Sequence, residues 1–169
     1  GSEFAREEIA EAVRDGKLLS MEIEFNRSCN FRCLYCYASD HTDQRDELRK
    51  EEFFDLITQA RDLGARKMII LGGEPMLYPD IMEMIRFIRN LKMDVELFTN
   101  GTNITRETAQ ELYDAGVRVV LKMNTFDEKL QDTLSGRKGA YAQIQGALQN
   151  LKRAGYPSVN HPMGVSTII

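Results

Sequence analysis

The sequence predicts an α/β fold organised around a parallel sheet, and three observations support this. Short apolar segments alternate along the chain with longer segments in which apolar residues recur at helical spacing, as they do in successive β-α-β units. Unusual polar or cysteine-containing motifs follow directly after several of these apolar segments, where sites form in parallel sheets. The chain has 169 residues, 43% of them hydrophobic and 28% charged, which is ordinary for a single globular domain.

The first half of this alternation begins with a helix and a strand. Residues 5–14 predict a short helix that ends before Gly16, because its apolar residues share one face. Residues 18–25 predict the first strand, since apolar residues alternate there with glutamates. Residues 48–63 predict a longer helix with one apolar face, and the mostly apolar residues 67–71 predict the second strand.

The second half repeats the pattern. A helix rich in Met and Ile is predicted to begin at Pro79, because proline is favoured at the first helical position. Residues 95–98 predict the third strand, Thr105 is suited to cap a helix that ends at Ala115, and residues 117–123 predict the fourth strand. The remaining elements are a helical region interrupted near residues 136–139 that ends at Gly155, and a last apolar run at residues 163–169.

The most informative motif follows the first strand and contains the only three cysteines of the chain, Cys29, Cys33 and Cys36. Three cysteines cannot all pair with one another as disulfides. Their thiolates are soft ligands that suit an iron–sulfur cluster or zinc. Because both centres usually take four protein ligands, three cysteines leave one position open for a substrate or cofactor.

Two other interpretations of the cysteines compete with this one. Isolated cysteines are often buried as small hydrophobic residues, although this close spacing beside polar residues disfavours that. The three cysteines with His41 could also form a structural Cys3His zinc site. The position of further motifs favours a catalytic cluster, because these motifs follow the other strands and parallel strands bring their carboxyl ends to one edge.

These further motifs lie at three strand ends. Gly72-Gly73-Glu74-Pro75 follows the second strand, Thr99-Asn100-Gly101 follows the third, and Lys122 and Asn124 lie at the end of the fourth. The two glycines allow a ligand to approach the main chain closely, and the proline favours an extended glutamate held over the rim, suited to an ammonium group. A tight turn with a solvated glutamate is the alternative.

Two cations extend this predicted site. Lys122 lies in an apolar strand, where its charge needs a partner such as a cofactor carboxylate, unless its stem carries the ammonium to solvent. Arg137 could join it as a bidentate carboxylate clamp.

Charge and cysteine usage narrow the range of partners and compartments. The net charge of −4 and pI near 5.3 disfavour nucleic acid and anionic membranes as partners. We see no signal peptide and no apolar run long enough to span a membrane. Unpaired cysteines fit a reducing cytoplasm. Residues 1–4 look like a cloning scar, and residues 5–169 are expected to form one domain that is truncated at its C-terminus.

The combined motifs, from about residue 21 to residue 169, resemble the radical S-adenosylmethionine (radical SAM) superfamily. Within this superfamily, the residues in and around the motifs are most similar to the branch that contains the molybdenum-cofactor cyclase, the SPASM peptide maturases and viperin. The resemblance implies a partial parallel (β/α) barrel with about five of six β/α units present. It also implies a [4Fe-4S] cluster on the three cysteines that binds and reductively cleaves S-adenosylmethionine, so that a 5′-deoxyadenosyl radical abstracts a substrate hydrogen.

The resemblance further assigns roles to single residues. Glu74 and the Gly72-Gly73 backbone would contact the methionine ammonium, while Lys122 and Arg137 would contact its carboxylate, although family members often have serine in place of Lys122. The other residues implied in cofactor binding are Tyr35 and Tyr37 near the adenine, Ser166 near the ribose, and Pro75, Thr99, Asn100 and Asn124.

The implied reaction is an oxidoreductase or lyase step in cofactor biosynthesis, or in the modification of a peptide or small molecule. Flavodoxin or ferredoxin would be the electron donor. The alternative from another class is a non-catalytic zinc module or electron-transfer Fe–S module that acts as a scaffold.

Overall fold

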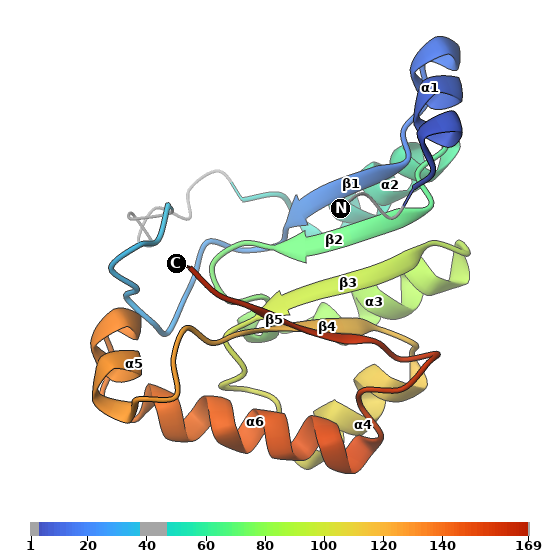
Figure 1. The fold of residues 1–169 in the computed structure, drawn as a ribbon. Coiled ribbons are helices and arrows are strands. Elements are labelled where there is room, and N and C mark those ends of the chain that lie inside the picture. Colours follow the sequence, from blue (N-terminus) through green and yellow to red (C-terminus); the bar gives the residue numbers. More distant parts are fainter. Residues whose placement is uncertain (1–3, 38–46, 169) are drawn as a thin grey trace.

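The computed structural model describes residues 4–37 and 47–168. Five strands form one parallel sheet whose spatial order follows the sequence. They are β1 (Ser20–Glu24), β2 (Lys67–Leu71), β3 (Asp94–Thr99), β4 (Arg118–Lys122) and β5 (Met163–Ser166). All five arrowheads therefore point the same way, and the strands end at one edge of the sheet (Figure 1).

The helices connect these strands in order. They are α1 (Arg6–Asp15), α2 (Lys50–Asp62), α3 (Ile81–Asn90), α4 (Arg106–Asp114), α5 (Glu128–Ser135) and α6 (Ala140–Ala154), with a 3-10 turn η1 (Pro75–Leu77). Helices α2, α3, α4 and α6 lie along one face of the sheet, whereas α5 lies at its carboxyl edge (Figure 1). A sequential strand order with helices on one face is the arrangement of a (β/α) barrel, so the predicted partial barrel with five β/α units is confirmed.

Some predicted boundaries are wrong. The third helix begins at Ile81 and not at Pro79, because Pro79 lies in a turn in which the Ile81 amide donates to the Tyr78 carbonyl, with proline at the second position that such turns favour. The last strand ends at Ser166, because the Ile168 amide donates to the side-chain Oδ1 of Asn124. Its predicted last residue, Ile169, and the predicted zinc ligand His41 lie outside the described residues.

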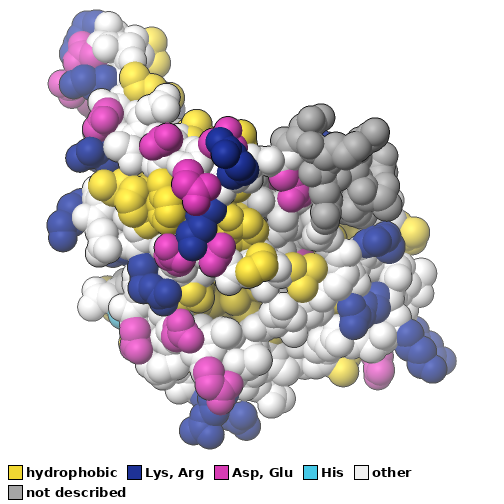
Figure 2. All heavy atoms as spheres, turned by 180° about the vertical axis from the view of Figure 1, so that it is seen from behind, with side chains coloured by type: hydrophobic (Ala, Val, Ile, Leu, Met, Phe, Trp, Pro, Cys, Tyr) yellow, Lys and Arg dark blue, Asp and Glu magenta, His cyan; other side chains and the backbone are white. Residues whose placement is uncertain are grey.

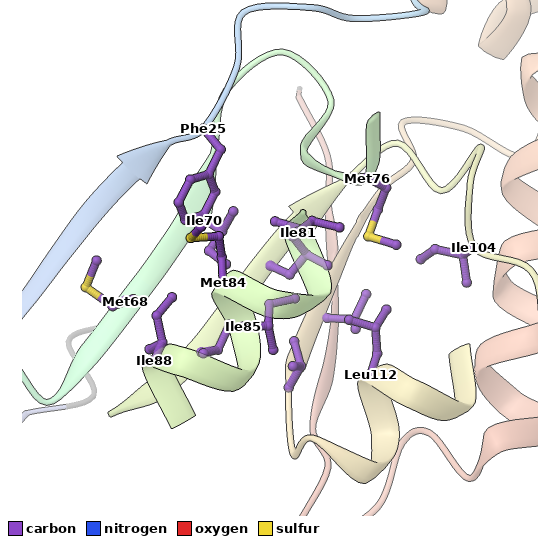
Figure 3. Packing of buried hydrophobic residues seen from close by; sticks show 14 of the residues in the cluster. Phe25, Met68, Ile70, Met76, Ile81, Met84, Ile85, Ile88, Ile104 and Leu112 are labelled. Carbon is purple, nitrogen blue, oxygen red and sulfur yellow. The ribbon is translucent and has the colours of Figure 1, made fainter. Parts of the chain in front are cut away.

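The core lies between the sheet and the helices. Met84, Ile85 and Ile88 of α3 are fully buried, and Met84 and Ile88 lie on the side of α3 that faces Met68 and Ile70 of β2 (Figure 3). Burying one such side chain stabilises the fold by about 1.5–3 kcal/mol, so this single helix face contributes substantially. Met76 and Met93, on either side of α3, are buried as well.

The other face of the sheet, opposite the helices, is more polar. Glu96 of β3 is 8% exposed and forms ion pairs with Lys67 of β2 and Arg118 of β4. Further along β2 and β3, toward the carboxyl edge, Leu71 and Phe98 are only partly buried. On this face, the sheet therefore carries apolar side chains at the edge where the strands end.

The helix-covered side carries both signs of charge (Figure 2). Basic and acidic side chains are interspersed over it, as in the ion pairs that Lys50 makes with Asp80 and Glu83. No helix in the described part of the chain is long and apolar enough to cross a membrane.

Candidate active site

The cysteine segment runs from β1 across the carboxyl edge of the sheet. Phe25 and Phe31 are buried at 1% and 3% exposure and anchor this segment in the core, while the three cysteines are half-buried. All three line one cavity of about 250 Å³. The other lining residues come from the same segment, from the carboxyl ends of β2, β3 and β4 with the residues that follow them, and from the last part of the chain: Phe31, Tyr35, Tyr37, Leu71, Gly72, Gly73, Glu74, Phe98, Thr99, Asn100, Lys122 and Ile168.

Burial affects the thiols before any metal binds. Burial raises the pKa of Cys29 and of Cys33. At Cys33, a hydrogen bond from Tyr35 lowers the pKa and opposes part of this effect. A buried thiolate therefore needs a positive partner, and a metal centre supplies one. Within residues 4–37 and 47–168, no three His, Cys, Asp or Glu side chains converge as they would around a single ion. The three cysteines would be the residues to hold a [4Fe-4S] cluster, which proteins bind through cysteine thiolates.

Gly72 and Gly73 line the cavity, where their contact with a cofactor stays a prediction, and they also pack closely against the chain's own backbone. A Cβ on Gly73 would lie 2.1 Å from the Ser28 carbonyl oxygen, and one on Gly72 would lie 2.7 Å from the Asn26 carbonyl oxygen. The Gly73 and Glu74 amides donate to the Asn26 and Ser28 carbonyls. The missing side chains thus make room for the chain's own backbone, and the two glycines fix the cysteine segment to the end of β2.

The sequence predicts that Glu74 extends over the rim, and the structure shows that this prediction is wrong. Glu74 is 1% exposed, and its Oε1 accepts hydrogen bonds from the Met76 amide at 3.0 Å and the Thr99 hydroxyl at 2.6 Å. Its Oε2 accepts one from the Asn100 amide at 2.7 Å. Burial raises the pKa of this carboxyl, while these donors lower it. Since a carboxylate has about four acceptor sites, one acceptor site remains on Oε2, and Glu74 is one of the residues that line the cavity.

The end of β3 is joined to the cysteine segment by side chains. The side-chain Nδ2 of Asn100 donates to the Asn30 Oδ1 at 2.8 Å and lies 3.9 Å from the Cys29 sulfur. The Asn30 Nδ2 donates to the Thr102 hydroxyl at 2.7 Å. Asn100 therefore contacts a predicted metal ligand directly, and its hydrogen bonds hold the strand end beside it.

Lys122 is the only basic side chain among the described residues that line the cavity. Its ammonium lies 4.9 Å from the centre of the Tyr35 ring, a cation–π contact. Burial lowers the pKa of Lys122, and the negative charge of the Cys33 thiolate opposes this. The Tyr35 hydroxyl accepts a 2.6 Å hydrogen bond from the Asn124 Nδ2, and burial raises the pKa of Tyr35 to about 12.

The other predicted residues lie around this cavity in different ways. Tyr37 reaches its mouth, where its hydroxyl donates to Glu24, which raises the pKa of Tyr37 to about 12. Pro75, Ser166, Asn124 and Arg137 do not belong to the lining of this cavity. Arg137 instead donates from Nη1 to the Asn30 carbonyl at 2.9 Å, so its role as a carboxylate clamp stays a prediction.

The sequence did not indicate several residues that build the site. Leu71 and Phe98, at the ends of β2 and β3, and Ile168, after β5, contribute apolar side chains to the lining. Gln131 is 1% exposed, and its Oε1 accepts the Asn124 and Thr125 amides. A polar residue on the buried face of a short helix was the available signal for it.

Comparison with known proteins identifies the class. The family model of the radical SAM superfamily matches residues 23–168, and the chain belongs to this superfamily. The predicted cofactors, a [4Fe-4S] cluster and S-adenosylmethionine, are those of the family.

Individual relatives agree with the predicted branch. The chain is 35% identical over 118 residues to a probable GTP 3′,8-cyclase from Pyrococcus abyssi, covering 69% of this chain and 38% of that protein. It is 35% identical over 134 residues to an AdoMet-dependent heme synthase from Oleidesulfovibrio alaskensis, covering 78% and 34%.

Solved structures share the fold. SuiB from Streptococcus suis, bound to its precursor peptide SuiA, superposes with a TM-score of 0.76 at 23% identity, over 96% of this chain and 36% of that one. The enzyme anSMEcpe with bound AdoMet gives 0.71 at 19% identity, over 88% and 43%. The chain thus spans less than half the length of each of these four proteins.

Proposed function

We propose that this chain is the catalytic core of a radical SAM enzyme, with Cys29, Cys33 and Cys36 as the ligands of a [4Fe-4S] cluster. One observation carries the proposal: the three thiols, a buried carboxylate and an ammonium group line the same cavity at the carboxyl edge of the sheet. When bound, the cluster and S-adenosylmethionine supply one-electron cleavage of the sulfonium and a 5′-deoxyadenosyl radical that abstracts hydrogen from the substrate.

The chain's own residues orient the cofactor. The acceptor site left on Glu74 Oε2 suits the methionine ammonium, because the other three sites are already satisfied and hold the carboxylate in place. Lys122 suits the methionine carboxylate. The cation–π contact with Tyr35 holds its ammonium over the cavity, so less conformational freedom is lost when the cofactor binds.

The apolar part of the lining suits the adenosyl group and excludes water. The rings of Tyr35, Phe98 and Tyr37 and the side chains of Leu71 and Ile168 contribute it. A shielded cavity prevents side reactions of a reactive intermediate. The assignment of Ser166 to the ribose belongs to this proposal.

We infer a peptide or small-molecule substrate, in peptide modification or cofactor biosynthesis. The peptide bound to SuiB supports the first, and the cyclase and heme synthase relatives support the second. Flavodoxin or ferredoxin in the cytoplasm would supply the electron.

The proposal is tested by anaerobic reconstitution with iron and sulfide, followed by measurement of bound iron and of 5′-deoxyadenosine formed from S-adenosylmethionine with dithionite. We expect about four irons per chain and slow formation of 5′-deoxyadenosine, both lost when the three cysteines are replaced by alanine. A protein that takes up zinc in place of the cluster, or that forms 5′-deoxyadenosine equally well without the cysteines, would contradict the proposal.

A further inference from the structure

The last turn of α5 contacts the cysteine segment through backbone groups. The Arg32 amide donates to the Ser135 carbonyl and the Leu34 amide donates to the Leu134 carbonyl, each at 3.0 Å. The last four carbonyls of a helix have no partner within the helix. The helix end and the cysteine segment therefore satisfy each other's hydrogen bonds on both sides of Cys33, a ligand of the predicted cluster.

Gly136 allows this close approach. It ends α5 in the left-handed conformation, at φ 59° and ψ 28°. A Cβ at this position would lie 2.1 Å from the Arg32 carbonyl oxygen and 2.8 Å from its carbonyl carbon. Any side chain larger than hydrogen would thus push the cysteine segment away from α5, quite apart from the backbone strain that it would add.

Arg137 adds a side-chain contact to the same segment. Its Nη1 donates to the Asn30 carbonyl at 2.9 Å, and its guanidinium carbon lies 5.7 Å from the centre of the buried Phe31 ring. Together with the two backbone hydrogen bonds, residues 134–137 hold the segment at three successive points, Asn30, Arg32 and Leu34. We call residues 134–137 the α5 clamp.

The α5 clamp is itself tied to the sheet. Gln131, one turn earlier, accepts the amides of Asn124 and Thr125 after β4 and donates to the Ser135 hydroxyl at 2.8 Å. Asp132 accepts the amides of Gly139 and Tyr141 at the start of α6. The position of the cysteine segment is thus set from the end of β4, which lies far away in sequence.

We propose that the α5 clamp is the positioning device of the cysteine segment, and that Arg137 acts on this segment and not on the cofactor carboxylate. The clamp fixes the backbone between Cys29 and Cys36 before the cluster assembles, as outer groups orient the ligands of other metal sites. The presence of a cluster on this segment rests on the proposed function. The ordering of the segment by the α5 clamp is independent of the proposed function.

The test compares two glycines with almost the same backbone conformation. Gly16 ends α1 at φ 63° and ψ 33°, and a Cβ there would meet nothing within 4 Å. Gly136→Ala and Gly16→Ala therefore carry similar backbone strain, but only the first conflicts with the cysteine segment. Hydrogen exchange of the Arg32 and Leu34 amides is measured in the metal-free proteins, and resistance of the reconstituted cluster to a ferrous chelator is measured in parallel.

For Gly136→Ala we expect faster exchange of the Arg32 and Leu34 amides and a cluster lifetime shortened about 10- to 100-fold. Gly16→Ala should match the wild type in both. Equal exchange in the two variants would overturn the proposal. If wild-type protein holds no cluster, the proposed function fails, and the exchange result still decides whether the clamp orders the segment.

Arg137→Gln is the second variant, because it removes the side-chain contact without a backbone conflict and covers the case in which Gly136→Ala does not fold. We expect it to speed exchange in residues 30–34 and to shorten the cluster lifetime, with unchanged affinity for S-adenosylmethionine in molecules that retain the cluster. Weakened S-adenosylmethionine binding with normal exchange would show that Arg137 contacts the cofactor and would overturn its positioning role.

Discussion

Replacing Glu74 with Gln tests the account of the site at its most buried charge. The native carboxylate accepts three hydrogen bonds, from the Met76 amide, the Thr99 hydroxyl and the Asn100 amide. A glutamine of the same shape has one acceptor oxygen and one NH2 group. Whichever way its amide is turned, the NH2 group faces a backbone N–H, so at least one buried amide loses its partner.

The expected cost follows from these contacts. An unsatisfied buried amide costs about 1–3 kcal/mol, and bonds to a neutral oxygen are weaker than bonds to a carboxylate by about 1 kcal/mol. Burial raises the pKa of Glu74, which means that the buried negative charge is itself unfavourable. Removing this charge therefore offsets part of the stability lost with the hydrogen bonds. We expect Glu74→Gln to lower the free energy of unfolding by about 2 kcal/mol, or the melting temperature by about 4–8 °C for a chain of this length.

Thermal unfolding of the metal-free protein measures this change. Glu22→Gln is the matched control, because Glu22 is an exposed glutamate on neighbouring β1, and its replacement should change stability by less than about 0.5 kcal/mol. If the two variants melted at the same temperature, the carboxylate of Glu74 would not be the acceptor that holds the ends of β2 and β3 together.

Three further predictions concern neighbouring groups. Gly73→Ala should destabilise the protein by about 3 kcal/mol, the upper part of the range for overpacking, because its Cβ would meet the Ser28 carbonyl oxygen; Gly146→Ala, with open space around its Cβ, should be neutral or stabilising in the same melt, and equal losses would contradict the close approach. Lys122→Met should weaken binding of S-adenosylmethionine about tenfold or more by calorimetry, whereas unchanged affinity would remove Lys122 from the site. Hydrogen bonds from the Tyr141 and Gly139 amides lower the pKa of Asp132, so its stabilising effect is present above its unfolded pKa and is lost as pH falls through the lower folded value. Asp132→Asn should therefore flatten the fall of melting temperature between about pH 5 and pH 2, and a curve parallel to that of the wild type would refute this.

Local pattern was sufficient for the fold. Helical faces and strand alternation are set by which side of each element is buried, so residues such as Met84, Ile85 and Ile88 could be assigned to the core from their spacing alone. Parallel strands then bring their carboxyl ends to one edge, which is why the cysteines, Glu74, Asn100 and Lys122 could be grouped from their positions after successive strands.

Long-range packing was beyond the sequence pattern. Nothing in the local sequence says that Glu74 turns inward to three donors, that the space at Gly73 is filled by Ser28, or that Gly136 meets Arg32. Each of these depends on the backbone of a segment far away along the chain. The local sequence pattern of a turn with glycine and glutamate is the same whether these residues face a ligand or another loop.

The central claim is that one iron of a cluster on Cys29, Cys33 and Cys36 is open to S-adenosylmethionine. Electron paramagnetic resonance of the reconstituted, dithionite-reduced protein, with and without S-adenosylmethionine, tests this most directly. We predict a [4Fe-4S]+ signal that changes shape when S-adenosylmethionine is added. A cluster signal that is indifferent to S-adenosylmethionine would contradict the claim.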